Sequence, residues 1–179
     1  TVRQAMQIPS QQIVRMAEMF ADSSRSFMMG VGTTYYVASI SQYYFSDLAD
    51  CYYSALSSDE FSVVDIKRGD MVLAISQSGE TYDTKTALVS AKKRGAKTGA
   101  IVNVMGSAIS MMVDQVIMQG SGPEICVVST KAALAQTFIM VRVAIELGFI
   151  RKKINLKDYK KFQKEMQEFS AIIEIVLNE

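Results

Sequence analysis

The hydrophobic positions of the chain fall into short continuous apolar runs separated by longer segments of helical spacing. Residues 26–31 and 71–76 (SFMMGV and MVLAIS) are apolar nearly throughout, a pattern typical of strands buried on both faces of a parallel sheet. Less regular runs at 51–56, 97–104 and 115–119 predict three more strands. We therefore expect a sheet of five strands.

Three segments that follow such runs carry apolar residues every three or four positions, which predicts helices at 33–49, 81–94 and 129–147. Gly95 and Gly148 come directly after the second and third segments and are interpreted as their stop signals. The residues expected on one apolar face are Tyr36, Val37, Ile40, Tyr44 and Leu48 in the first helix, and Leu134, Phe138, Val141 and Ile145 in the third. Periodicity leaves open whether these faces pack into the core or against a second copy of the chain.

Strands alternating with helices of this length imply right-handed βαβ units and a parallel sheet. We expect an α/β fold in which a five-stranded, parallel, doubly wound sheet has helices on both faces, in a three-layer sandwich. Residues 1–150, including an amphipathic segment at 10–21, are expected to form one domain. Residues 151–179 are interpreted as a linker and peripheral helix. Ligands of such sheets bind beyond the carboxyl ends of the strands, where the strand order reverses.

Composition narrows the class of protein. The 179 residues suit one domain, and 19 basic against 18 acidic side chains leave a net charge of only +1, without a basic stripe in residues 1–150 to bind nucleic acid. No apolar run reaches the roughly 18 to 20 residues that span a bilayer, and residues 1–10 do not resemble a signal peptide. We therefore expect a soluble cytoplasmic protein with no nucleic-acid or membrane partner.

The absence of histidine from the sequence removes the commonest general base and metal ligand. Cys51 and Cys126 make no metal-ligand spacing and are expected to be buried free thiols. Neither a dinucleotide-binding fingerprint nor a P-loop is present. We therefore expect no metal and no organic cofactor.

Three loops that follow predicted strands are rich in hydroxyl side chains and glycine. The first, residues 30–34, places Thr33 and Thr34 at a helix start, where threonine is also an ordinary cap. The second, residues 76–81 (SQSGET), combines three hydroxyls, an amide and backbone N–H groups at a helix N-terminus, where the helix dipole favours an anion such as a phosphate monoester. A capping box closed by Ser78 or Thr81 is the alternative.

The third loop, residues 120–131 (GSGPEICVVSTK), adds Ser129 and Thr130 at the start of the last core helix. Hydroxyl groups bind phosphate as neutral donors, so the balanced charge of the chain is no objection to an anion site. The same groups suit the many hydroxyls of a sugar.

Several motifs resemble those of the isomerase domain of the glucosamine-6-phosphate synthases (glutamine:fructose-6-phosphate amidotransferases). They are GVGTTYY, SDEF, AISQSGETYDT and GPEICVVSTKAALAQ, in the order and spacing of that family, and the similarity covers about residues 26–148. SQSGET followed by VSTKA is specific to this family within the wider group of sugar isomerase (SIS) domains. The resemblance implies the first of two SIS halves, with a flavodoxin-like fold, a role in amino-sugar metabolism, and fructose 6-phosphate or glucosamine 6-phosphate as ligand.

The resemblance also implies which residues touch the ligand. They are Thr33, Thr34, Ser76, Gln77, Ser78, Thr81, Val127 and Ser129. In the family pattern the four residues from the SQSGET loop hold the phosphate, Val127 contributes its backbone, and Ser129 places its hydroxyl near the sugar.

The chain departs from the family pattern where catalysis is concerned. It contains no glutaminase domain, no second SIS half with the glutamate and lysine of the ketose–aldose step, and no histidine for ring opening. Residues 1–9 resemble a shortened form of the segment that leads into the family's isomerase domain, and residues 164–179 resemble the helix that connects the two halves. We therefore expect one half of a longer isomerase, with a natural single-SIS protein as the alternative.

Hydrogen transfer between C1 and C2 of a sugar needs an acid and a base. Only Glu60, Glu80, Glu124 and Lys131 lie near the three loops in the sequence, and none is assigned a catalytic role. Glu124 and Lys131 fit a structural ion pair equally well, and Glu80 fits a helix-dipole partner. Whether this chain is an enzyme by itself therefore stays open. A sugar-phosphate sensor and a dimerisation module are the alternatives, and SIS domains usually pair, so a homodimer or larger assembly is expected.

Overall fold

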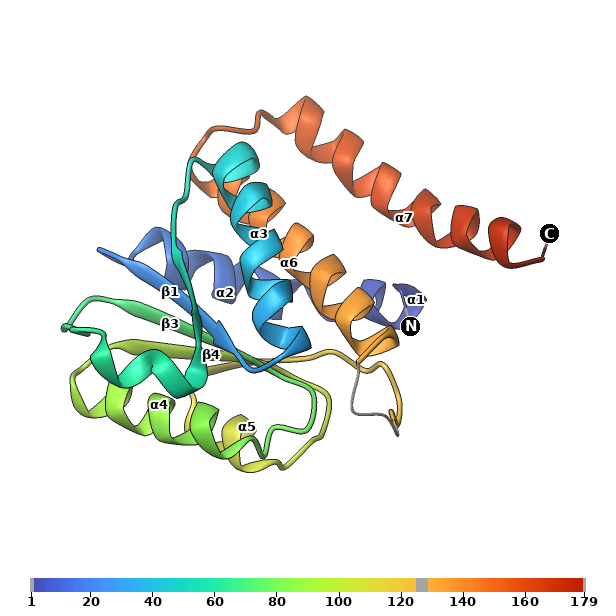
Figure 1. Cartoon of the computed structure of the whole chain (residues 1–179). Coiled ribbons are helices and arrows are strands. Elements are labelled where there is room, and N and C mark those ends of the chain that lie inside the picture. Colours follow the sequence, from blue (N-terminus) through green and yellow to red (C-terminus); the bar gives the residue numbers. More distant parts are fainter. Residues whose placement is uncertain (1, 125–128, 179) are drawn as a thin grey trace.

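The computed structural model of the chain describes residues 2–124 and 129–178, and its centre is a parallel sheet (Figure 1). The strands are β1 Ser26–Gly30, β2 Ser54–Ser57, β3 Met71–Ser76, β4 Lys97–Val102 and β5 Gln115–Met118, in the order β2-β1-β3-β4-β5. Each neighbouring pair in this order is parallel. The chain order reverses between the adjacent strands β1 and β3, so the doubly wound five-stranded sheet expected from the sequence is confirmed.

Helices cover both faces of the sheet (Figure 1). On one face pack α2 Ser10–Ala21, α3 Thr33–Ala49 and α6 Lys131–Ile150; on the other lie η1 Ser58–Val63, α4 Tyr82–Lys93 and α5 Ala108–Met112. Each face has its own hydrophobic core, and successive side chains of a strand enter the two cores in turn. In β3, Leu73 enters the first core and Val72 the second, which explains why this strand is apolar at every position.

The longer elements match the sequence prediction closely. Helices α2 and α3 have the predicted bounds, α4 is one residue shorter at each end, and every predicted strand is present, although β2 begins at Ser54 instead of position 51. Three short elements were not predicted: α1 Val2–Met6, η1 and α5. Each has five or six residues, too few for a helical period to be recognised.

The prediction that Gly148 stops the last core helix is wrong. Helix α6 continues to Ile150, and Gly148 lies inside it where α6 packs against α3. A Cβ atom at Gly148 would stand 2.1 Å from the carbonyl oxygen of Leu48, so glycine permits the close approach of the two helices. The residue serves packing rather than termination.

The predicted apolar face of α3 is divided between the core and the surface, an alternative that the sequence left open. Tyr36 and Ile40 are exposed by 69% and 47%, and Leu134 of α6 by 44%. The buried face of α3 is lined by the smaller side chains Thr34, Val37, Ala38, Ser41 and Ala49, with Phe45 as its large member. Small residues face inward because α3 packs closely on both the sheet and α6, which leaves an apolar stripe of α3 at the surface.

Among the described residues, α6 is the one helix long and apolar enough to cross a membrane by length and composition, which the sequence analysis did not anticipate. Most of it is buried between α2 and α3, and a core helix of this kind passes the same test. Burial inside the domain accounts for its composition.

The last helix, α7 Leu156–Asn178, lies against α6 and α1, and both chain ends lie on the same side of the molecule (Figure 1). Tyr159 stacks on Phe149 with ring centroids 4.4 Å apart and donates a 2.7 Å hydrogen bond to Glu146. Phe169 stacks on Phe138 at 6.1 Å. These contacts attach α7 to the domain, while the predicted division at residue 150 stays a prediction.

Candidate functional site

A pocket of about 310 Å³ opens at the carboxyl ends of β1 and β3, where the strand order reverses. It is lined by Val31, Gly32, Thr33, Thr34, Ser76, Gln77, Ser78, Thr81, Glu124 and Ser129. These residues come from the three hydroxyl-rich loops, which lead into α3, α4 and α6. Seven of the eight residues proposed from the sequence therefore lie together, while Val127 lies outside the described residues. Their role in binding stays a prediction.

The SQSGET loop directs its hydroxyl protons away from its own backbone. Ser76 Oγ accepts the Gly79 N–H at 3.0 Å and shares a 3.1 Å hydrogen bond with Thr81 Oγ1, and Ser78 Oγ accepts the Glu80 N–H at 3.2 Å. A hydroxyl that accepts from the backbone still has its proton to donate. Ser78, and one member of the Ser76–Thr81 pair, are thus arranged as donors toward a ligand.

The capping-box alternative for this loop does not match the geometry. Thr81 is the N-cap residue of α4, yet its side chain makes no capping hydrogen bond, and the Ser78 hydroxyl bonds within the loop. The positive end of the α4 dipole therefore faces the pocket without a side-chain cap from Thr81. This is the arrangement that stabilises a bound anion at a helix N-terminus.

Gly79 shapes the loop. Its φ is +67°, and a Cβ atom there would stand 2.1 Å from the Oγ atom of Ser107, which precedes α5. The loop can fold tightly over this serine only because position 79 has no side chain.

Of the two threonines at the start of α3, only one has a hydroxyl that is not committed to the loop itself. Thr34 Oγ1 accepts the Val31 N–H and donates to the Val31 carbonyl, both at 2.9 Å, and Thr34 is buried. Thr33 is partly exposed in the pocket wall. Thr34 therefore holds the loop, and Thr33 is the better placed of the two to contact a ligand.

Among the described residues of the pocket lining, Glu124 is the one that is ionisable, and the sequence analysis gave it no binding role. Its Oε1 accepts the N–H groups of Thr130 (3.0 Å) and Lys131 (3.1 Å), and its Oε2 accepts the Ser129 hydroxyl at 2.7 Å. Burial disfavours the charged form, but these hydrogen bonds outweigh it and hold the pKa of Glu124 below its ordinary value. The carboxylate occupies the N-terminus of α6.

The other charged candidates have structural contacts. The Lys131 ammonium donates to the Pro123 carbonyl, so its link to Glu124 uses the backbone N–H instead of an ion pair. Glu80 accepts the Ala108 N–H at the start of α5 and a hydrogen bond from Lys85. Glu60 is exposed on η1, on the other side of the sheet from α3 and α6. None of the three lines the pocket.

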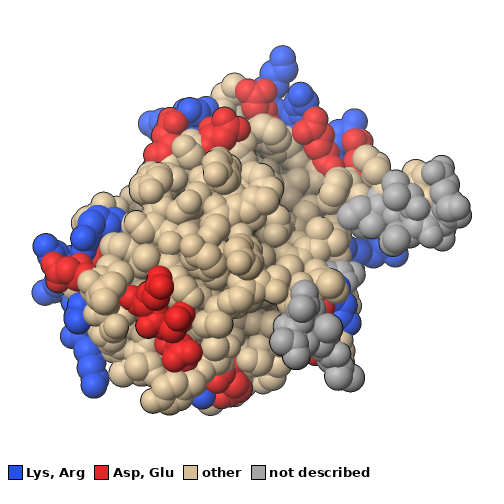
Figure 2. Space-filling view, viewed as in Figure 1, with Lys and Arg blue, Asp and Glu red and all other residues tan. Residues whose placement is uncertain are grey.

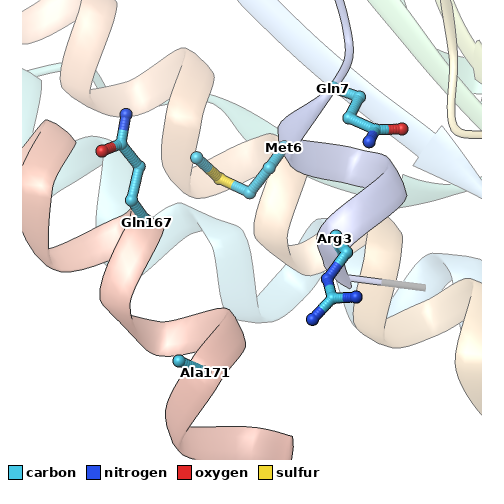
Figure 3. A pocket seen from close by; sticks show the side chains of 5 residues that line it. All are labelled: Arg3, Met6, Gln7, Gln167 and Ala171. Atoms are coloured by element: carbon cyan, nitrogen blue, oxygen red, sulfur yellow. The ribbon is translucent and has the colours of Figure 1, made fainter.

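Two other hollows are lined by other parts of the chain. One of about 360 Å³ lies between α1 and α7, where Figure 3 shows Met6 pointing from α1 toward α7, with Arg3 nearby. A shallow one of about 680 Å³ runs along the exposed tyrosines of α3. The first lies away from the carboxyl ends of the strands, and the second adjoins the site pocket at Thr33. Among the residues that the structure describes, no group of three or more acidic or cysteine side chains is placed to hold a metal ion.

The chain has two cysteines, Cys51 and Cys126. Cys51 is a buried free thiol, as expected, and burial raises its pKa against the opposing effect of Arg151. A thiol with a raised pKa is a poor nucleophile at neutral pH. Cys126 lies outside the described residues.

Comparison with known proteins identifies similar sequences and folds. A family model described as SIS domain matches residues 19–146. The glutamine–fructose-6-phosphate aminotransferase (isomerizing) of Methanocaldococcus jannaschii is 36% identical over 174 residues, which cover 96% of this chain and 15% of that protein. This chain thus spans only a small part of that relative.

Solved structures share the fold. The C-terminal domain of glucosamine-fructose-6-phosphate aminotransferase from Francisella tularensis superposes with a TM-score of 0.83 at 23% identity, over 99% of this chain and 54% of that one. The NanR protein of Vibrio vulnificus, solved in complex with ManNAc-6P, superposes with a TM-score of 0.66 at 17% identity, over 96% of this chain and 64% of that one.

Proposed function

The chain belongs to the SIS domain family, and from that membership we propose that its pocket binds a sugar phosphate, fructose 6-phosphate or glucosamine 6-phosphate. The phosphate is assigned to the SQSGET loop and the sugar to the side of Thr33 and Ser129. Val127 is kept as a backbone contact by resemblance. The proposal needs neither a metal nor an organic cofactor.

The observation that carries the proposal is the hydrogen-bond direction in the SQSGET loop. Ser76 and Ser78 accept N–H groups of their own loop, which leaves the protons of Ser78 and of one member of the Ser76–Thr81 pair for an anion at the N-terminus of α4. Neutral donors at a helix N-terminus bind phosphate without a cluster of lysines. The relative solved with ManNAc-6P supports a phosphorylated sugar as the ligand class.

We propose that the chain is part of a longer protein with the role of the similar aminotransferases, a part in forming amino-sugar phosphates in the cytoplasm. This chain would supply sugar-phosphate binding, and the remainder of such a protein the acid and base. A non-catalytic sugar-phosphate-binding module is the second candidate. It is favoured by one observation: Glu124, the single ionisable group in the part of the lining that the structure describes, is engaged with the start of α6.

We also propose that the exposed stripe of α3 pairs with a second copy of the chain. Tyr36, Ile40 and Tyr43 are 47% to 74% exposed and follow one another at helical spacing. Figure 2 shows that the face bearing α3 is broad and free of charged side chains at its centre. An exposed apolar patch of this kind on a folded domain marks an interaction surface. The self-complementary form of such a contact is a twofold dimer.

Calorimetric titration of fructose 6-phosphate, glucosamine 6-phosphate and inorganic phosphate into the chain tests the binding proposal. A Ser78→Ala variant should weaken all three roughly 10- to 150-fold, because each loses a hydrogen bond to a charged oxygen. Ser62→Ala, an exposed serine of η1 outside the pocket, is the matched control and should bind as the wild type does. If neither sugar phosphate binds at millimolar concentration, the proposal is wrong.

A further inference from the structure

The two ends of the pocket have opposite hydrogen-bonding polarity. At the α4 end, Ser76 and Ser78 accept backbone N–H groups, and Ser78 and one member of the Ser76–Thr81 pair keep a proton to donate. At the α6 end, the Ser129 hydroxyl gives its proton to Glu124 Oε2 at 2.7 Å and keeps only its lone pairs for a ligand. One end therefore presents donors and the other an acceptor.

The direction of the Ser129–Glu124 hydrogen bond follows from the charge of Glu124. An ionised carboxylate can only accept, so Ser129 must be the donor, whereas in the Ser76–Thr81 pair either hydroxyl can donate. The N–H groups of Thr130 and Lys131 on Oε1 keep the carboxylate in its ionised form.

Glu124 also fills one of the three helix N-termini that border the pocket, that of α6. Without it, the start of α6 would attract a phosphate much as the start of α4 does. With it, a phosphate at that end would meet a carboxylate and the lone pairs of Ser129. A ligand with a phosphate at one end and hydroxyls at the other is thus favoured in a single orientation.

We propose that Glu124 is a positioning residue that fixes the Ser129 hydroxyl as an acceptor, so that this end of the pocket selects a sugar hydroxyl and rejects a phosphate. The inference rests on the proposed function and adds to it the residue that determines ligand orientation. Glu124 acts through Ser129 and through the α6 N-terminus.

The variant Glu124→Gln tests this with nearly unchanged volume. Its amide oxygen can still accept the N–H groups of α6, but its NH₂ group now donates to Ser129 Oγ and turns the hydroxyl proton toward the pocket. Dissociation constants are measured by calorimetry for inorganic phosphate and for the sugar phosphate that the wild type binds. We expect the sugar phosphate to weaken about 3- to 10-fold. Inorganic phosphate should bind as tightly as it does to the wild type or more tightly, since its donors at the α4 end are untouched and the negative charge that repels it at the α6 end is removed.

Ser129→Ala and the double variant decide whether Glu124 acts through Ser129. Ser129→Ala should show the same selective loss, and the double variant should bind no more weakly than Ser129→Ala, because the two residues form one unit. Equal losses for both ligands in Glu124→Gln, or full additivity in the double variant, would overturn the inference and leave the proposed function standing. Should Glu124→Gln fail to fold, unchanged sugar-phosphate affinity in Ser129→Ala overturns it equally. A wild type that binds neither sugar phosphate defeats both proposals.

Discussion

Arg25 holds both carboxylate oxygens of Asp70, with Nε 3.0 Å from Oδ1 and Nη2 2.6 Å from Oδ2. The Asp70 side chain is 2% exposed and also accepts the Lys67 N–H at 2.7 Å. Asp70 immediately precedes β3, and Arg25 immediately precedes β1. The pair therefore joins the starts of the two strands whose far ends form the pocket.

Asp70→Asn should destabilise the fold. The variant loses the charge of a buried carboxylate and leaves the Arg25 guanidinium without its partner, at a cost of about 2–3 kcal/mol in the free energy of unfolding. Urea denaturation at pH 7 measures it. Asp65→Asn is the control, since Asp65 forms an ion pair with Lys67 in which both side chains are mostly exposed, and it should change stability by less than about 0.5 kcal/mol. Equal effects of the two substitutions would contradict the prediction.

The same pair predicts how stability changes with pH. Burial disfavours the charged form of Asp70, but hydrogen bonds from Arg25 and the Lys67 N–H outweigh it and lower its pKa. A carboxylate whose pKa is lower in the folded state contributes stability above its unfolded pKa of about 3.9 and loses it as pH falls through the folded pKa. The wild type should therefore lose stability faster than Asp70→Asn as the pH falls below about 5. Parallel curves of unfolding free energy against pH would refute this.

The substitution Gly148→Ala tests whether glycine is needed at this position for the packing of α6 against α3. Alanine normally stabilises a helix interior by about 1 kcal/mol over glycine. Here the added Cβ would meet the Leu48 carbonyl oxygen at 2.1 Å, and α3 and α6 would have to move apart. We expect a net loss of about 1–3 kcal/mol by chemical denaturation. A gain in stability would mean that the two helices can separate without cost.

The exposed stripe of α3 predicts self-association. In light scattering at micromolar concentration, the wild type should have a mass near twice 19.8 kDa. Ile40→Asp should shift it to the monomer by placing a charge in an apolar contact. Met111→Asp is the matched control, because Met111 is 74% exposed on α5, on the opposite side of the sheet. A monomeric wild type would contradict the prediction that this stripe pairs with a second copy of the chain.

The sequence reveals those features that depend on composition along a single strand or helix. The run MVLAIS predicts β3 because its side chains enter two cores, and SQSGET stands out because its hydroxyls and glycine follow one another directly. Features that depend on two distant segments were missed. The role of Gly148 depends on Leu48, and the donor role of Ser129 depends on the direction of its bond to Glu124. The exposure of Tyr36 depends on which side of α3 meets the sheet, and periodicity does not determine that.

Two features require glycine at position 79, its positive φ and its closeness to Ser107, and substitutions can test them one at a time. Alanine at position 79 would adopt a φ of +67°, which costs a residue with a Cβ atom about 1–2 kcal/mol, and its Cβ would also stand 2.1 Å from Ser107 Oγ. We expect Gly79→Ala to lose about 2–4 kcal/mol of stability and to weaken phosphate binding, since Ser76 accepts the N–H of residue 79.

Removing the Ser107 side chain leaves the positive φ as the remaining cost of alanine at position 79. In a Ser107→Gly background the contact disappears, so Gly79→Ala should lose only the roughly 1–2 kcal/mol due to φ, as measured by thermal and chemical denaturation against Ser107→Gly alone. Phosphate affinity should return toward that of Ser107→Gly, because the loop can again close over position 107. If Gly79→Ala costs the same in both backgrounds, the contact with Ser107 is not what determines the shape of the loop. In that case the left-handed backbone at position 79 alone requires glycine.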